Sequence, residues 1–233
     1  MKELLKLDCE TANNWFIEIF ENFDINLNNA KKNTVKLQYA KKSDGLHRGF
    51  YCPSIFIEHL VGNVGRGELT ERKPKGSYFE YGFNSDNKLI YSYNFQNSKK
   101  ITSHFYEFIK YENGVSYSVF CEYKGEMYNP IYCSKCCYDD SNRITEYNLY
   151  WISPISRKTC TLDKEVYIYS ANDIVVDKYS FSMKFENIKA SYQKSSFKFF
   201  FNENGKMLYY TSEDGRKFEL NPKAINPFLE NKS

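Results

Sequence analysis

The residues best suited to chemistry are three clustered cysteines, Cys133, Cys136 and Cys137. A C-x-x-C pair can supply half of a tetrahedral zinc site. A structural site needs a second pair, no further C-x-x-C or H-x-x-x-H follows, and Cys121 and Cys160 complete a site only if the strands align them. The βαβ setting of a thioredoxin-like redox pair is also missing. We therefore interpret these residues as ordinary thiols on a strand and near a turn, and we predict no metal and no cofactor.

The three histidines, His47, His59 and His104, lie far apart in the sequence. No HExxH, GxSxG or P-loop lysine motif surrounds them. An enzyme would have to assemble its site from distant cysteines and histidines or from the loop carboxylates Glu68 and Glu71. We keep that alternative, and we predict that the chain is not an enzyme.

The stretch GNVGRGELTERKPKGS at residues 62–77 is the longest break in the hydrophobic pattern. Its glycines do not spell G-x-G-x-x-G, so the pattern predicts a mobile loop and not a phosphate cradle. We place a boundary here between a mixed N-terminal segment, residues 1–76, and a β-rich part, residues 77–233, the two forming one compact unit. The loop offers four basic candidates for contact with an acidic partner: Arg66, Arg72, Lys73 and Lys75.

The N-terminal end of the chain is acidic, because residues 1–30 hold two lysines against six carboxylates. Residues 31–50 reverse the sign. The simplest interpretation is two solvated faces, and the alternative is a polarised partner-binding surface that includes Glu18 and Glu21.

One helix is predicted, over residues 10–23, from an apolar stripe at helical spacing. The stripe consists of Trp15, Phe16, Ile19, Phe20 and Phe23. We expect Phe16 and Phe20 to be buried against a sheet.

Short strands separated by turn signals dominate the rest of the chain. Val35, Leu37 and Tyr39 alternate with polar residues, which predicts a half-buried strand. Turn signals follow at residues 85–87, 96–98, 112–114, 124–125, 139–142, 153–154, 163–164, 171–173, 203–205 and 213–215. The sequence therefore predicts a mainly β fold, a β-rich α+β class: an antiparallel meander over about residues 77–220, with the N-terminal helix packed on its apolar face.

Charge and composition exclude several partners. The net charge is +3 and the chain has 21 Tyr and 19 Phe, most of them alternating as core residues do. This pattern gives no argument for specific nucleic-acid binding. No signal peptide and no run of about 18 apolar residues is visible, and the seven cysteines are an odd number. We expect a cytoplasmic protein with reduced thiols and no membrane contact.

Residues 111–114 and 199–207 resemble the tyrosine-rich hairpin units of YD-type and antitoxin-like repeat proteins, although the chain has no strict repeat period. In the style of its composition, rich in Tyr, Asn and Lys, the chain resembles immunity proteins of bacterial polymorphic-toxin systems. That resemblance implies a bacterial antitoxin that binds and inhibits a toxin.

Three functions remain open at this point. The first is a non-enzymatic protein-binding module, with a toxin as its partner if the resemblance holds. The second is a closed β-barrel that binds a small apolar ligand. The third is the enzyme with a non-contiguous site. Neither the oligomeric state nor the identity of a partner follows from the sequence.

The loop yields a first prediction. Trypsin should cut between Arg66 and Lys75 before it cuts within residues 88–185, because glycines and Pro74 preclude a regular ladder there. Reversing the charges of Arg72 and Lys73 should weaken partner binding and leave the melting temperature nearly unchanged, since exposed charges contribute little to stability. Protection of this stretch from trypsin would contradict the boundary.

Overall fold

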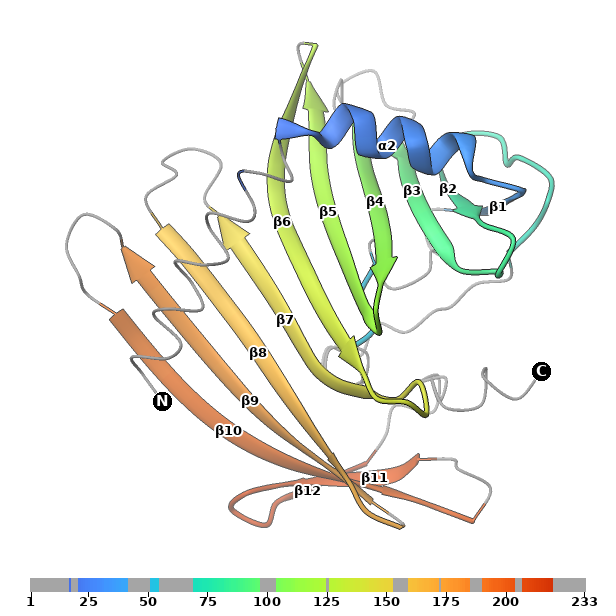
Figure 1. Cartoon of the computed structure of the whole chain (residues 1–233). Coiled ribbons are helices and arrows are strands. Elements are labelled where there is room, and N and C mark those ends of the chain that lie inside the picture. The colour runs from blue at the N-terminus through green and yellow to red at the C-terminus, as the bar shows by residue number, and fades with distance from the viewer. Residues whose placement is uncertain are drawn as a thin grey trace.

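The computed structural model describes residues 17, 21–41, 51–54, 69–96, 104–124, 126–152, 159–171, 173–184, 190–203 and 207–219. These residues form a twelve-stranded sheet and a helix that lies across one face of it (Figure 1). The elements are α2 (Phe23–Lys32), β1 (Lys36–Lys41), β2 (Tyr78–Phe83), β3 (Leu89–Phe95), β4 (His104–Glu112), β5 (Val115–Lys124), β6 (Met127–Tyr138), β7 (Ile144–Ile152), β8 (Thr159–Tyr169), β9 (Asp173–Lys184), β10 (Ala190–Phe201), β11 (Met207–Ser212) and β12 (Lys217–Glu219).

The strands lie in the sheet in the order of the chain, and each pairs antiparallel with the next. This arrangement confirms the predicted β-rich meander with an N-terminal helix on its face. The strand order runs from β1 to β12 without returning, so the sheet is not closed. The closed barrel of the second hypothesis is therefore not formed.

In the connections that the structure describes in full, β2–β3, β4–β5, β6–β7 and β11–β12, turn residues lie where they were predicted. Asn113 and Gly114 both adopt positive φ, 49° and 75°, which is the geometry of a tight primed turn between β4 and β5. Asn87 and Asn142 take the same region, at 57° and 59°. The turn predicted at residues 163–164 is wrong, because both residues lie inside β8. Their polar groups have cross-strand partners, which lets the strand continue: Ser180 donates to Asp163 over 2.5 Å, and Lys164 pairs with Glu146 at 3.0 Å.

The helix that the structure describes begins where the predicted one ends. Most of residues 10–23, including Phe16 and Phe20, lies outside the described residues, whereas α2 shares Phe23 with the predicted helix and continues over residues 24–32, for which no helix was predicted. Asp24 in its first turn and Lys31 and Lys32 in its last turn complement the helix dipole. Within the described part of the chain, no helix is long and apolar enough to cross a membrane.

The helix packs through Phe23 and Leu27, which are 2% and 1% exposed. The Phe23 ring lies 5.5 Å from Phe108 of β4 and 4.7 Å from Tyr128 of β6. We call this side of the sheet the helix face; its core continues from Tyr91 across the strands to Phe181.

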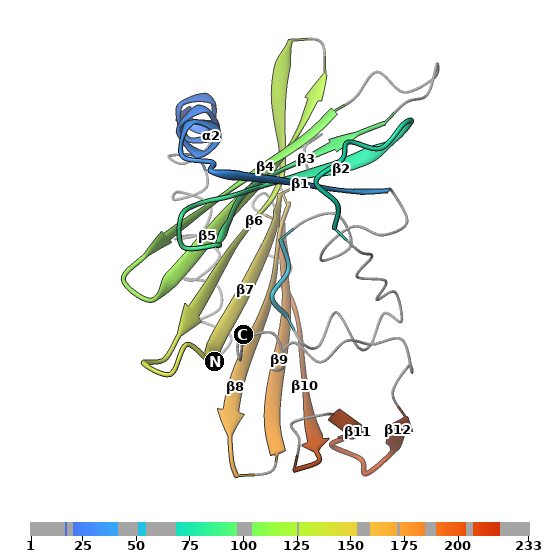
Figure 2. The same cartoon turned by 90° about the vertical axis from the view of Figure 1, so that its right-hand side faces the viewer.

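The opposite side is the strap face, because the short segment of residues 51–54, the strap, lies on it. Cys52 of the strap belongs to a core with Tyr132, Tyr147 and Phe199. The sheet is strongly bent, and β11 and β12 turn toward the side where the strap lies (Figure 2). Tyr210 of β11 accordingly joins the same core.

At the β1 edge, the prediction that Val35 and Leu37 lie on the buried side of the strand is wrong. Val35 and Leu37 are 70% and 40% exposed, whereas Ala40 on the other face is 1% exposed. The reason is that the helix covers other strands: the main contacts of α2 are with β3 and β4 and not with β1. The outer edge of β1 is instead bridged by Thr70, which exchanges two backbone hydrogen bonds with Tyr39 at 2.7 and 2.9 Å. Part of the predicted loop is thus tied to β1, while residues 62–68 lie outside the described residues.

The docking of α2 predicts an asymmetry between two of its aliphatic residues. Leu27→Ala should lower the free energy of unfolding by about 2–5 kcal/mol, because it leaves a cavity in a buried core. Ile25→Ala, at a position 60% exposed on the same helix, should change it by less than about 0.5 kcal/mol. Chemical denaturation measures both values, and equal effects would contradict the docked helix.

Candidate functional site

The clearest surface feature is a continuous group of aromatic rings on the helix face, which we call the aromatic ladder. Most of its members are half-buried, and Tyr78 is buried. The ladder consists of Tyr39, Tyr78, Tyr93, Phe95, His104, Tyr106, Tyr123 and Tyr128, from strands β1 to β6.

Strand register produces the ladder. Tyr93 is opposite Tyr106, and the two rings stack with centroids 4.6 Å apart. One row further on, His104 is opposite Tyr123, which is opposite Tyr128. Because directly opposed residues point to the same face, aromatic residues at every second position of neighbouring strands meet side by side.

A hydrogen bond and burial act on several tyrosines of the ladder. The Tyr93 hydroxyl lies 3.1 Å from Nδ1 of His104. Burial raises the pKa of Tyr128 to about 12, with the nearby Asp24 carboxylate adding to the shift. Burial also raises the pKa of Tyr106. At neutral pH Tyr106 and Tyr128 therefore present phenol hydroxyls, not phenolates.

The ammonium groups of two lysines lie close to the faces of rings in the ladder. Nζ of Lys31, on α2, lies 4.8 Å from the centre of the Tyr106 ring, and Nζ of Lys73 lies 4.7 Å from that of Tyr78. Both distances are within the range of cation–π attraction. Glu80 of β2 lies opposite Tyr93 and accepts a hydrogen bond from the Tyr91 hydroxyl over 2.7 Å. The ladder thus carries charges of both signs.

The partner-binding residues predicted from sequence are only partly brought to this surface. Lys73 joins the ladder at Tyr78, and Arg72 and Lys75 are exposed beside it in the chain. Glu21 is exposed just before α2, whose first residue contacts Tyr128 of β6, so it lies across the ladder from Lys73. Glu18 and Arg66 lie outside the described residues.

Alternation with polar residues is also the pattern of buried strand positions, so the sequence predicts these aromatics to be core residues. A signal was available in the sequence, because one predicted helix is a small cover for a long aromatic meander. Sequence alone does not say which rings remain uncovered.

A second feature is a fully buried carboxylate under the strap. Glu107 of β4 is 0% exposed. Its Oε2 accepts hydrogen bonds from the backbone N–H of Tyr51 over 2.7 Å and from the Ser92 hydroxyl over 3.2 Å. Burial raises the pKa of Glu107 to about 7, and these hydrogen bonds oppose the shift. Sequence reasoning missed this residue, although its place among apolar residues in HFYEFIKYE was a signal.

The other end of the strap is held in the same way. Ser54 donates a 2.6 Å hydrogen bond to Oε2 of Glu165 on β8, and Tyr167 donates one of 2.5 Å to the same oxygen. Burial raises the pKa of Glu165 as well. In the middle of the sheet, the Tyr51 hydroxyl lies 2.8 Å from that of Tyr138. The two carboxyls thus anchor the strap.

Within the described residues, the cysteines, histidines and loop carboxylates singled out from the sequence do not come together as a catalytic or metal-binding centre. Cys133 and Cys136, three residues apart on β6, fall on opposite faces and belong to different cores, so their sulfurs cannot bind one ion. No group of three or more His, Cys, Asp or Glu with the geometry of a metal site occurs among these residues. Glu71 is exposed, and His47, His59 and Glu68 lie outside the described ranges.

Glu107 yields a pH prediction. Its folded pKa of about 7 lies above the reference value of 4.5, so its contribution to stability is complete below about pH 4.5 and is lost as the pH rises to 7. Relative to Glu107→Gln, the wild type should lose about 3 kcal/mol of unfolding free energy between pH 4.5 and 8. Denaturant titrations at several pH values measure the difference. The exposed Glu203→Gln is the control and should follow the wild type. Parallel curves for wild type and Glu107→Gln would contradict the buried, protonated carboxyl.

Comparison of the chain with protein-family models, with curated proteins and with solved structures finds no match.

Proposed function

We propose that this chain is a non-enzymatic protein-binding module and that the aromatic ladder is its contact surface. The observation that carries the proposal is the run of half-buried rings, five of them tyrosines, from β1 to β6. The rings form one contiguous group at the surface of the sheet, and large contiguous apolar patches at a protein surface mark interaction sites.

The chemistry of the ladder suits a protein partner. Tyrosine buries a large area with few rotatable bonds and offers a hydroxyl for hydrogen bonding, so it is enriched at the centres of interfaces. Neighbouring rings already restrain one another, for example Tyr106 between Tyr93 and Tyr128 at 4.6 and 5.9 Å. Binding therefore costs little additional side-chain entropy.

The charges favour a protein over a nucleic acid. A stacking platform for single strands needs a basic groove that follows the phosphates. Here Glu80 and Asp24 stand beside the rings together with Lys31 and Lys73. This mixed pattern fits a partner with apolar groups over the rings and carboxylates opposite Lys73 and its exposed neighbour Arg72.

The resemblance to immunity proteins narrows the partner to a toxin, which the chain would inhibit by binding in the bacterial cytoplasm. The same surface supports the apolar-ligand alternative less well, because the sheet is open. The enzyme alternative has no assembled Cys, His and carboxylate group among the described residues to support it.

Site-specific photo-cross-linking tests the proposal. The photoreactive p-benzoylphenylalanine replaces Tyr123 in the ladder or, as the control, Tyr192, which is 38% exposed on β10 of the same face. In cells of the source organism, the ladder position should capture one defined protein that the control position does not. Mass spectrometry identifies it.

The captured protein is then purified and titrated with variants. Tyr106→Ala or Tyr123→Ala should weaken binding about thirty-fold, the loss typical of an aromatic hot spot. Tyr192→Ala should bind like the wild type. Equal affinities for all these variants, or capture of the same protein at both positions, would refute the ladder as the contact surface.

A further inference from the structure

A pocket of about 280 Å³ lies on the other flank of α2, away from the aromatic ladder. It opens where β3 and β4 separate: the two strands pair only over residues 91–94 and 105–108. Ile90, the next residue, has no register partner on β4 and is also skipped by the bulge between β2 and β3. Bulges of this kind are frequent beside functional sites, because they interrupt the ladder and redirect side chains.

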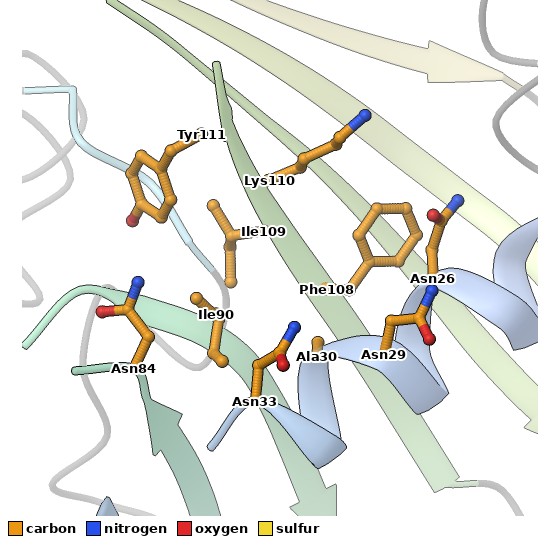
Figure 3. A pocket seen from close by; sticks show the side chains of 10 residues that line it. All are labelled: Asn26, Asn29, Ala30, Asn33, Asn84, Ile90, Phe108, Ile109, Lys110 and Tyr111. Atoms are coloured by element: carbon orange, nitrogen blue, oxygen red, sulfur yellow. The ribbon is translucent and has the colours of Figure 1, made fainter. Parts of the chain in front are cut away.

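The pocket has an apolar floor and an amide rim. Buried Ile90, Phe108 and Ile109 form the floor. Tyr111 closes one side, with its hydroxyl donating to the Leu89 carbonyl over 3.0 Å. The rim carries four carboxamides: Asn26, Asn29 and Asn33 in a row along α2, and Asn84 at the end of β2 (Figure 3).

These amides are available to a ligand. The side chains of Asn26, Asn29 and Asn33 make no hydrogen bond within the part of the chain that the structure describes. Oδ1 of Asn84 accepts the backbone N–H groups of Asp86 and Lys88 over 3.1 and 2.9 Å, which fixes the amide and leaves its Nδ2 as a donor. The rim therefore offers both donors and acceptors.

Charge and size limit the ligand. Among the described residues that line the pocket, Lys110 is the ionic one, and its Nζ is paired with Glu112 over 2.5 Å. These lining residues therefore offer no uncompensated charge to an anion or a cation. Its volume of about 280 Å³ is just below the range of typical small-molecule sites, roughly 300–1,000 Å³. A compact, neutral molecule fits, with an apolar face and several polar groups around its edge.

We infer that this pocket binds a pyranose unit of a neutral glycan. A pyranose ring has C–H groups on its faces, which match the apolar floor, and hydroxyls around its rim. Each hydroxyl both donates and accepts, as each carboxamide does through its two atoms. The site is separate from the proposed protein-binding surface, because α2 places Lys31 over the ladder and the asparagine row over the pocket.

The test uses the free sugars as probes. Methyl glycosides of glucose, galactose, mannose and N-acetylglucosamine are titrated into ¹⁵N-labelled protein and followed by NMR. At least one should bind saturably in the millimolar range and shift the side-chain amide signals of Asn26 and Asn29. Failure of every sugar to saturate would overturn the inference.

Matched variants on one helix locate the binding. The double variant Asn26→Ala and Asn29→Ala should weaken the affinity about ten-fold or more, because two hydrogen bonds are lost. Asn28→Ala, an exposed position of α2 that does not line the pocket, should bind like the wild type. Alanine favours helix, so both proteins should fold. Unchanged affinity in the double variant would refute the site.

Discussion

A large aromatic sheet has two faces, and the structure depends on how each face is kept from water. On the strap face, the cover is a segment of four described residues whose polar groups would be buried without partners. The carboxyl of Glu107 accepts the Tyr51 N–H at one end, and that of Glu165 accepts the Ser54 hydroxyl at the other. These buried acceptors hold the strap across strands from β4 to β8.

The helix face is only partly covered by α2. Both functional proposals depend on the parts of this face that the helix leaves open. α2 spans ten residues and contacts chiefly β3 and β4. On one flank it leaves most rings of the aromatic ladder half-buried, and on the other it forms the wall of the pocket. The same short helix therefore separates two surfaces of different chemistry, one aromatic with mixed charge and one lined by neutral amides.

The open edge of the sheet is also covered by few residues. β1 is an edge strand, and exposed edge strands pair readily with other chains. Thr70 occupies the centre of its open edge, and exposed Lys36 and Lys41 stand at its two ends. Both devices oppose association through the backbone, which is consistent with recognition through side chains on the face of the sheet.

The sequence by itself determined the antiparallel meander and the turns of the hairpins that the structure describes in full. Alternation and Asn-Gly or Asp-Gly signals depend on residues adjacent in the chain, so Asn113 and Gly114 could be placed correctly without any knowledge of the fold. The inward face of Tyr179 and Phe181 was also predictable, and both are buried. The exposure of Leu37 was not, because it depends on where α2 ends. Asp163 and Lys164 appeared to mark a turn because their partners Ser180 and Glu146 lie on neighbouring strands.

Only the tertiary structure decided which side chains are covered. The N–H of Tyr51 and the carboxyl of Glu107 are 56 residues apart, and no local pattern links them. The ladder likewise needs the register of six strands, and the pocket needs a bulge next to a pair of separating strands. Local sequence selects strands and turns through short-range conformational preferences, whereas burial, a raised carboxyl pKa and an uncovered aromatic surface result from contacts between segments that are distant in the chain.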